Sequence, residues 1–392
     1  MQRSCPRVGM PRRSRPWRTA VLSAFFLAAV VVPASARFAP PAAATTTTTP
    51  NFNHIFLILM ENHDYSQIIG SSSAPYINSL AKTGAISTNY HAVGHPSEPN
   101  YLALTSGNSF SSNSCVTGDG DPTGACLVNA TNITDRLKLA GKRWKGYMES
   151  MPSPCYLTDS GEYAVRHNPF PYYQDIQLNS RRCDNHDVRY SQLSTDLTST
   201  STTPNYAFIT PNVCDDMHDC SVSTGDKWLA ANVPPILKSP AWTTQHSMMM
   251  IVWDECGACT DPNNQVPFIM LGSPGSGVRS GGFRSSISYN HYSLLKTIES
   301  SWGLPAMTAS DSNASPMNDF FATISPTGAP QVHVAGGKIV DQSGQAVQLR
   351  GVNRSGAEYA CAEGWGSSMD RPTTRHRSRP SNPGMPTPCD YP

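Results

Sequence analysis

The stretch His54–Met60 (HIFLILM) decides how the rest of the chain is interpreted, because six apolar residues follow one another without a break. An unbroken apolar run of this length is typical of a parallel strand that is covered on both faces. Ser247–Trp253 (SMMMIVW) has the same character. Both runs therefore predict strands in the interior of a sheet.

Weaker strand patterns and helical patterns lie around these runs. Tyr206–Thr210 and Val266–Leu271 are the weaker strand candidates, whereas Ala74–Thr83, Asn132–Ala140 and His291–Trp302 carry apolar residues at helical spacing. Strands that alternate with helices predict an α/β sandwich with a largely parallel central sheet over residues 52–325. In such sheets, functional residues gather beyond the carboxyl ends of the strands.

Acidic residues follow both buried runs directly. Glu61-Asn62 comes after the first run and Asp254-Glu255 after the second. Three carboxylates and one amide oxygen can hold a divalent cation, which neutralises a bound phosphate and lowers the pKa of a coordinated hydroxyl. The alternative for either pair is a polar turn after a strand.

Ser97 is the candidate nucleophile. It lies in the segment 94–102 (GHPSEPNYL), where it is a good helix N-cap and Pro99 suits the first turn. Free N–H groups at such a helix start attract an anion. Ser97 is therefore predicted to place its hydroxyl where a phosphate binds, although a plain capping role explains the same residue.

Two histidines are candidates for acid–base work. His167 lies in the segment 163–170 (YAVRHNPF), and His218 lies in 211–220 (PNVCDDMHDC) beside acidic residues. A histidine near neutral pH can pair with phosphate oxygens or protonate a leaving alkoxide. A surface or loop-packing role is the alternative for each. His291 is a weaker candidate for touching substrate, because it can also simply begin a helix.

These motifs, taken together and in this order, resemble the secreted phosphoesterase family of bacterial phospholipases C and acid phosphatases. The resemblance covers about residues 53–321 and rests on Glu-Asn, His-Pro-Ser-x-Pro-Asn-Tyr, Arg-His-Asn-Pro-Phe, Asp-Met-His-Asp and Trp-Asp-Glu. It implies an alkaline-phosphatase-like, three-layer α/β sandwich. It also implies that this chain is closer to the acid phosphatases, because the phospholipase branch often carries threonine at the position of Ser97.

The resemblance also implies roles for individual residues. Ser97 is the implied nucleophile, and His167 and His218 face the phosphate. The implied ligands of a divalent metal ion are Glu61, Asn62, Ser97, Asp254 and Glu255. Asn100 and Asn168 lie in the same motifs, and with His291 they are predicted to bind the substrate.

The N-terminus and the cysteines predict export. Residues 1–36 combine several arginines, the short apolar stretch 20–32 and Ala34-Ser35-Ala36, which is the pattern of a signal peptide. Residues 37–51 are a low-complexity linker. An even number of cysteines in the domain favours disulfides, and we expect neighbours in sequence to pair: Cys115–Cys126, Cys155–Cys183, Cys214–Cys220 and Cys256–Cys259. A zinc or redox site at the last pair is the alternative.

The C-terminal part has a different composition. Residues 326–366 contain a predicted β-hairpin, Lys338–Asp341 with Ala346–Leu349, and resemble the opening of family 5 cellulases. A complete barrel of that family needs about 250 residues, so a truncated, inactive fragment is expected. Residues 367–392 are rich in proline and arginine, have no Leu, Ile, Val or Phe, and predict a disordered tail.

The sequence thus predicts a secreted, metal-dependent phosphomonoesterase that works through a phosphoserine and takes a small phosphorylated substrate. A phospholipase C-type phosphodiesterase and a noncatalytic, carbohydrate-associated protein are the alternatives. The formal net charge of +1 argues against a nucleic-acid surface. No stable membrane insertion is expected once the signal peptide is removed, and the oligomeric state and the identity of the metal stay open.

Overall fold

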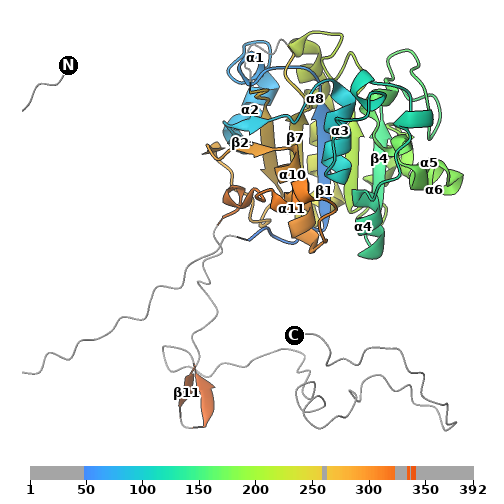
Figure 1. The fold of residues 1–392 in the computed structure, drawn as a ribbon. Helices are drawn as coiled ribbons and strands as arrows, with labels where there is room; N and C mark the ends of the chain where they lie inside the picture. The colour runs from blue at the N-terminus through green and yellow to red at the C-terminus, as the bar shows by residue number, and fades with distance from the viewer. Residues whose placement is uncertain (1–47, 258–262, 323–332, 336, 341–392) are drawn as a thin grey trace, which may run out of the picture. The chain divides into compact units, whose positions relative to one another are not determined.

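An eight-stranded sheet forms the centre of residues 48–322 (Figure 1). The computed structural model describes residues 48–257, 263–322, 333–335 and 337–340. The strand order is β5 (Asp187–Arg189), β4 (Trp144–Met148), β6 (Tyr206–Thr210), β1 (His54–Met60), β7 (Ser247–Trp253), β8 (Phe268–Gly272), β2 (Ala85–Ser87) and β9 (Phe283–Ser285). The five strands from β5 to β7 are parallel, and β8 is antiparallel to both of its neighbours. The predicted α/β class with a largely parallel sheet is confirmed.

The interior strands owe their place to their apolar runs. Every residue of β1, β6 and β7 is buried. These three strands have the predicted bounds, whereas β8 begins at Phe268, just after Pro267, which has no N–H for the ladder. β1 and β7 pair residue by residue from His54 opposite Ser247 to Met60 opposite Trp253. The residues that follow these two strands are therefore brought side by side.

Helices cover both faces of the sheet and form the outer layers of a three-layer sandwich (Figure 1). One face carries α3 (Ser97–Ser106), α4 (Ile133–Leu139), α10 (His291–Trp302) and α11 (Ala309–Asn313), which contact one another in sequence-distant pairs. The other carries α2 (Pro75–Thr83), α8 (Val222–Lys238) and α9 (Pro240–Thr244). The predicted helices are confirmed to within one residue at each end.

Shorter elements complete this part of the chain. They are α1 (Tyr65–Ile68), α5 (Gln174–Gln177), α6 (Ser180–His186), α7 (Gln192–Asp196), the two-residue strands β3 (Tyr90–His91) and β10 (Tyr289–Asn290), and the 3-10 turns Val116–Gly118, Gly124–Cys126, Val165–His167, Phe170–Tyr172 and Asn318–Phe320. Among the helices that the structure describes, none has the length and apolar character needed to cross a bilayer.

Three predicted disulfides are present: Cys115–Cys126, Cys155–Cys183 and Cys214–Cys220. Cys256 is also disulfide-bonded, and its predicted partner Cys259 lies outside the described residues.

The C-terminal hairpin differs from the prediction. The strand at Lys338 is present as β12 (Lys338–Val340), but it pairs antiparallel with β11 (His333–Ala335), the segment before it. Gly337 precedes β12 directly with a φ of 75°, and glycine tolerates the positive φ that a tight hairpin turn requires. The predicted partner Ala346–Leu349 lies outside the described residues, as do the signal peptide and the tail. The assignment of residues 326–366 to a cellulase fragment stays a prediction.

Candidate functional site

The carboxyl edge of the sheet carries the predicted acidic pairs. Glu61 and Asp254 directly follow β1 and β7, and both are fully buried. The one-to-one register continues past the strands, since the Asp254 N–H donates to the Met60 carbonyl at 2.9 Å. The Asn62 N–H donates to Asp254 Oδ1 at 3.2 Å from a turn with φ of 45°. The structure therefore brings the two acidic pairs together.

Ser97 lies over this edge at the start of α3. It is the first helical residue, and Pro96 occupies the cap position without a side-chain hydrogen bond, so the predicted capping role of Ser97 is wrong. Its hydroxyl donates to Glu61 Oε2 at 3.2 Å. The N–H of Glu98 donates to Asp119 at 3.0 Å. This N–H is therefore not free to bind an anion, which differs from the prediction. A carboxylate at the positive end of the helix accounts for that contact.

Tyr101 is a site residue that the sequence interpretation missed. Its hydroxyl donates to Glu61 Oε1, and its ring stacks on His167 with centroids 5.4 Å apart and an interplanar angle of 2°. Ser97 and Tyr101 are four residues apart, so they share one face of α3. This four-residue spacing is the sequence pattern that could have identified Tyr101 as a site residue.

His167 lies between two carboxylates. Its Nε2 is 3.5 Å from Glu61 Oε2 and its Nδ1 is 3.2 Å from Asp216 Oδ2. The ligand atoms of these three residues all lie within 4.8 Å of one another, a set that could hold a metal ion. Asp216 was predicted only as a neighbour of His218. The His218 ring lies 5.5 Å from the His167 ring, and its Nδ1 contacts Asp219 at 2.6 Å.

Asn100 and Glu255 join the Ser97 loop to the acidic edge. The Asn100 Oδ1 accepts from the backbone of Val93 and Gly94, while its Nδ2 lies 3.4 Å from Glu255 Oε2. His95 Nδ1 contacts the same carboxylate oxygen at 2.7 Å. Glu255 is thus part of the cluster, and Asn100 holds the loop that presents Ser97.

Asn168 and His291 are fully buried and bind protein groups. The Asn168 amide donates to both oxygens of Asp187, at 3.0 and 2.9 Å, and to Tyr163. His291 Nε2 donates to the Asp254 carbonyl at 2.6 Å, and Nδ1 accepts from the Tyr90 hydroxyl at 3.0 Å. The structure gives both residues positioning contacts, and their binding of substrate stays a prediction.

Burial makes the acidic cluster electrostatically unfavourable without a counter-charge. It raises the pKa of Asp254 to about 6 and that of Glu255 to about 9, and nearby Asp254 adds to the effect at Glu255. Burial first, and then neighbouring carboxylates, raise the pKa of Glu61 well above its usual range. In the part of the chain that the structure describes, no Lys or Arg lies within ion-pair distance of these three groups.

Two buried oxygens of the predicted ligand set also have no hydrogen-bond partner among the described residues. They are Asn62 Oδ1 and Asp254 Oδ2. Carboxylate and amide oxygens are the ligands that hard divalent cations take. The residues present therefore fit such a cation.

The fold and the site define an α/β protein that holds a serine hydroxyl against a buried acidic cluster at the carboxyl edge of parallel strands. Residues 71–305 match the Phosphoesterase family. The chain belongs to this family, and it is a hydrolase that acts on phosphoric esters. The family assignment in the sequence interpretation is thereby confirmed.

Known relatives carry phosphatase names. The chain is 32% identical over 283 residues to phosphatidylinositol-3-phosphatase of Mycobacterium tuberculosis, which covers 69% of this chain and 84% of that protein. It is 28% identical over 271 residues to acid phosphatase of Aspergillus fumigatus, with 67% of this chain and 58% of the fungal protein covered. The probable acid phosphatase of Kluyveromyces lactis is 31% identical, with 67% and 61% covered. The chain thus spans less than two thirds of these two fungal relatives.

Solved structures show more distant similarity. A protein of the alkaline phosphatase superfamily from Vibrio parahaemolyticus has a TM-score of 0.44 at 13% identity, with 78% of this chain and 84% of that chain covered. Human ectonucleotide pyrophosphatase/phosphodiesterase 5 has a TM-score of 0.43 at 13% identity, with 68% and 99% covered.

Proposed function

We propose that this protein is a secreted, metal-dependent phosphomonoesterase that transfers the phosphoryl group to Ser97 and then to water. The observation that carries the proposal is the Ser97 hydroxyl, which lies 3.2 Å from Glu61 Oε2 within a buried cluster of carboxylates that no Lys or Arg of the described residues pairs with. Glu61, Asn62, Asp254, Glu255 and Ser97 would hold the divalent cation. When bound, the cation supplies charge neutralisation for the phosphate and for the ionised serine.

The chain's own groups supply the nucleophile and the proton for the leaving group. The Ser97 Oγ, whose proton has passed to solvent water, attacks phosphorus, and the bond from phosphorus to the ester oxygen breaks. His218 is the proposed donor of the proton that the leaving alkoxide takes, since Asp219 contacts its Nδ1 and leaves Nε2 for the substrate. Water then cleaves the phosphoserine and restores Ser97.

His167 is proposed to orient Glu61 and to face the phosphate. Burial lowers the pKa of His167, which favours the neutral form of its ring between Glu61 and Asp216. A neutral ring can donate from only one nitrogen at a time. The stacked Tyr101 ring fixes the plane in which that nitrogen lies.

Export is part of the proposal, and disulfides support it because such bonds persist in oxidising compartments. Lipid monoesters are proposed members of the substrate panel, because one relative is named a phosphatidylinositol-3-phosphatase. The phosphodiesterase alternative is decided by assaying monoesters and diesters side by side.

The test is Ser97→Ala with Ser106→Ala as its control, since both serines are buried on α3 and the Ser106 hydroxyl bonds only backbone groups, those of Leu102 and Asn108. We expect Ser97→Ala to lower kcat by about 10³-fold or more. Stability should change by only about 1 kcal/mol, since one hydrogen bond is lost. A phosphoryl group trapped on Ser97 in a rapid acid quench would support the intermediate. A variant that keeps more than about a tenth of the rate would refute the role, since loss of a nucleophile costs far more.

A further inference from the structure

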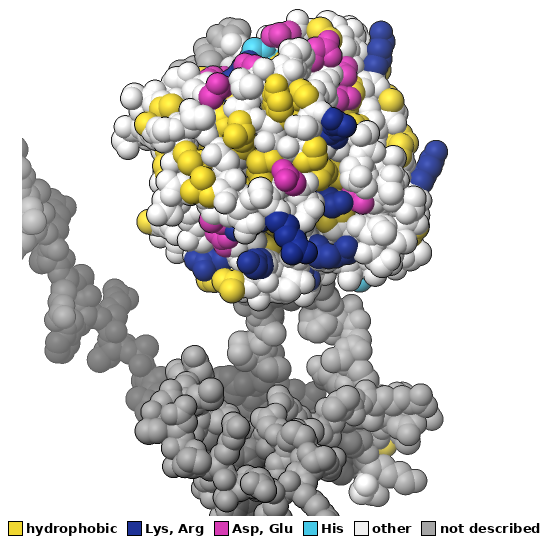
Figure 2. Space-filling model, turned by 90° about the vertical axis from the view of Figure 1, so that its right-hand side faces the viewer, with side chains coloured by type: hydrophobic (Ala, Val, Ile, Leu, Met, Phe, Trp, Pro, Cys, Tyr) yellow, Lys and Arg dark blue, Asp and Glu magenta, His cyan; other side chains and the backbone are white. Residues whose placement is uncertain are grey.

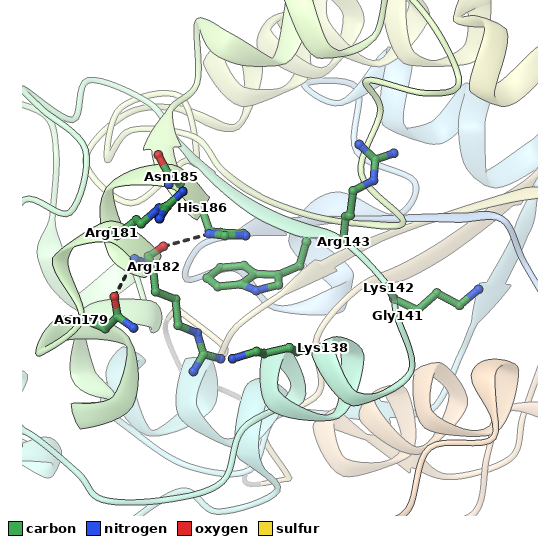
Figure 3. A pocket seen from close by; sticks show the side chains of 10 residues that line it. Lys138, Gly141, Lys142, Arg143, Asn179, Arg181, Arg182, Asn185 and His186 are labelled. Atoms are coloured by element: carbon green, nitrogen blue, oxygen red, sulfur yellow. Dashed lines mark hydrogen bonds between the residues drawn. The ribbon is translucent and has the colours of Figure 1, made fainter. Parts of the chain in front are cut away.

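A basic cleft of about 510 Å³ is lined by residues of α4, α6 and the loop between α4 and β4 (Figure 3), and it lies at the opposite end of the strands from Ser97. Trp144, the first residue of β4, forms its floor, so the cleft is at the amino ends of the strands. Its walls come from the end of α4, the loop 141–143 and helix α6. The His186 ring stacks on Trp144 with centroids 4.9 Å apart. None of these residues takes part in the proposed chemistry.

The cleft has an excess of positive charge. Lys138, Lys142, Arg143, Arg181 and Arg182 all contribute to its lining. Arg182 is neutralised, since its guanidinium pairs with Asp135 at 2.8 Å and with Asp175. For the other four, no carboxylate of the described residues lies within ion-pair distance. Lys142 instead lies over the Trp302 ring, 5.4 Å from its centroid.

Exposed leucines adjoin this cleft. Three large apolar side chains are exposed among the described residues, and two of them are Leu139 at 80% and Leu178 at 73%. Leu139 follows the lining residue Lys138, and Leu178 precedes the lining residue Asn179. Figure 2 shows this side of the molecule, where dark blue side chains gather toward the lower part of the described surface. Exposed leucines beside unpaired cations match an interface between lipid headgroups and acyl chains.

The walls of the cleft are braced against one another. Arg182 of α6 links Asp135 of α4 to Asp175 of α5, and the Cys155–Cys183 disulfide anchors α6 to the segment after β4. The cations are therefore presented on a preformed surface rather than on a loose loop. A preformed surface loses less conformational entropy when it binds.

We propose that this cleft and its two flanking leucines dock the protein onto the surface of a bilayer that contains anionic lipids. The lipid phosphates lie against Lys138 and Arg181, while Leu139 and Leu178 enter the acyl boundary. This is peripheral binding and needs no spanning segment. Because Ser97 lies at the other edge of the sheet, the site of a docked molecule faces solution. A docked molecule would therefore act on phosphomonoesters in solution or on another membrane rather than on lipids of the docked bilayer, and this part rests on the proposed function.

The test measures binding of the full chain to phosphatidylcholine vesicles with and without phosphatidylglycerol. Each Lys or Arg near an anionic surface contributes about fivefold to binding, so Lys138→Ala with Arg181→Ala should weaken it about 25-fold. The matched control is Lys82→Ala with Lys227→Ala, two exposed lysines on α2 and α8 of the other face. This control removes the same charge and should change binding by less than about twofold.

A second pair of variants tests the leucines. Leu139→Ser with Leu178→Ser should weaken binding by about tenfold or more even at high salt, where the charge contribution is screened. Ile287→Ser is the matched control, because Ile287 is the third exposed large apolar residue, at 49%. Hydrogen exchange should show vesicle-dependent protection of residues 133–145 and 174–186. The apolar N-terminal stretch is common to all variants and cannot produce that pattern.

Equal binding to both kinds of vesicle, equal effects of test and control variants, or protection elsewhere would overturn the proposal. Binding to dextran sulfate as tight as to vesicles, with no effect of the leucine variants, would also overturn it in favour of a polyanionic polysaccharide. Ser97→Ala should bind vesicles normally, so docking and catalysis fail independently. Vesicle-bound protein should hydrolyse a soluble monoester at the unbound rate, and inhibition on binding would overturn the outward orientation.

Discussion

Replacing Tyr101 by Phe removes one hydrogen bond to Glu61 and keeps the ring that stacks on His167. Glu61 Oε1 then loses its donor in a fully buried environment. A hydrogen bond to a charged group contributes about 1.5–3 kcal/mol, which is about 10- to 150-fold in an equilibrium constant. Loss of a group that orients a metal ligand typically costs about 10- to 100-fold in metal affinity. We therefore expect Tyr101→Phe to weaken binding of the activating cation by about 10- to 100-fold, with a smaller effect on kcat at saturating metal.

The sign of the pH dependence follows from the same contact. The Tyr101 hydroxyl lowers the pKa of Glu61, against the larger raising effect of burial. Without that hydroxyl the pKa of Glu61 rises further, so more protons must be displaced when a cation binds. The metal affinity of Tyr101→Phe should therefore fall more steeply than that of the unaltered protein as the pH is lowered.

The assay titrates Mg²⁺, Ca²⁺ or Zn²⁺ into chelator-treated protein and follows both calorimetric binding and hydrolysis of a phosphomonoester. Tyr206→Phe is the matched control, since Tyr206 is also a fully buried tyrosine and its hydroxyl has no hydrogen-bond partner among the described residues. If both variants bind metal equally well, the positioning role of Tyr101 is refuted. Unchanged metal affinity with a large loss of kcat would place Tyr101 in the chemical step instead.

Three further predictions test other parts of the structure. Chelation should abolish activity, and full activity in metal-free protein would contradict this. Asp254→Asn should weaken metal binding about 10-fold or more, as measured by elemental analysis of the purified protein. Burial raises the pKa of Asp187 to about 7 from 3.8, so the folded state binds more protons than the unfolded state and stability falls as the pH rises from about 4 to 7, by about 4 kcal/mol in total. Thermal melts of Asp187→Asn should show a flatter pH profile, and a profile as steep as that of the unaltered protein would contradict this. Removing the Cys155–Cys183 bridge, whose ends are 28 residues apart, should cost about 3–4 kcal/mol in a melting experiment, and an unchanged melting temperature would show that the bridge does not restrict the unfolded chain.

Much of the fold could be predicted because single segments carried the signal. The apolar runs of β1, β6 and β7 gave the strand bounds as the structure has them. The start of α3 was misplaced by one residue, since Pro96 takes the cap position and releases the Ser97 hydroxyl for Glu61. Capping statistics favour serine at such a position, and only the tertiary contact overrides them. The pairing of β12 with β11 was not predicted, because the predicted hairpin turn follows Lys338–Asp341 rather than preceding it.

Candidate site residues that directly follow a strand could be predicted from the sequence. Those that a loop places near the strand ends could not. Asp216 reaches His167 from a loop after β6, and no periodicity in the sequence relates these two residues. Tyr101 could have been predicted from its four-residue spacing from Ser97, but that spacing is equally typical of a helix that packs on a core. The Asn168 amide donates to Asp187, a contact that its motif did not predict, and its binding of substrate stays a prediction.

Buried carboxylates elsewhere in the fold differ from those of the candidate site in the donors that they contact. Asp226 of α8 is buried against the start of α2, where the N–H groups of Tyr76 and Ile77 donate to its two oxygens at 3.2 and 2.8 Å. Asp196 is buried against Lys145 at 2.5 Å. Each of these has a donor that offsets the loss of hydration. Asp254 has the Asn62 N–H on one oxygen and, within the described residues, no hydrogen-bond partner on the other, and it faces Glu61 rather than a Lys or Arg. Glu61 and Asp254 repel each other at the ends of the two central strands, which destabilises the folded state there. Proteins retain such unfavourable interactions where function requires them. A cation that binds the folded state and not the unfolded chain would reverse that cost. The metal that the proposed reaction needs would thereby also stabilise the centre of the sheet.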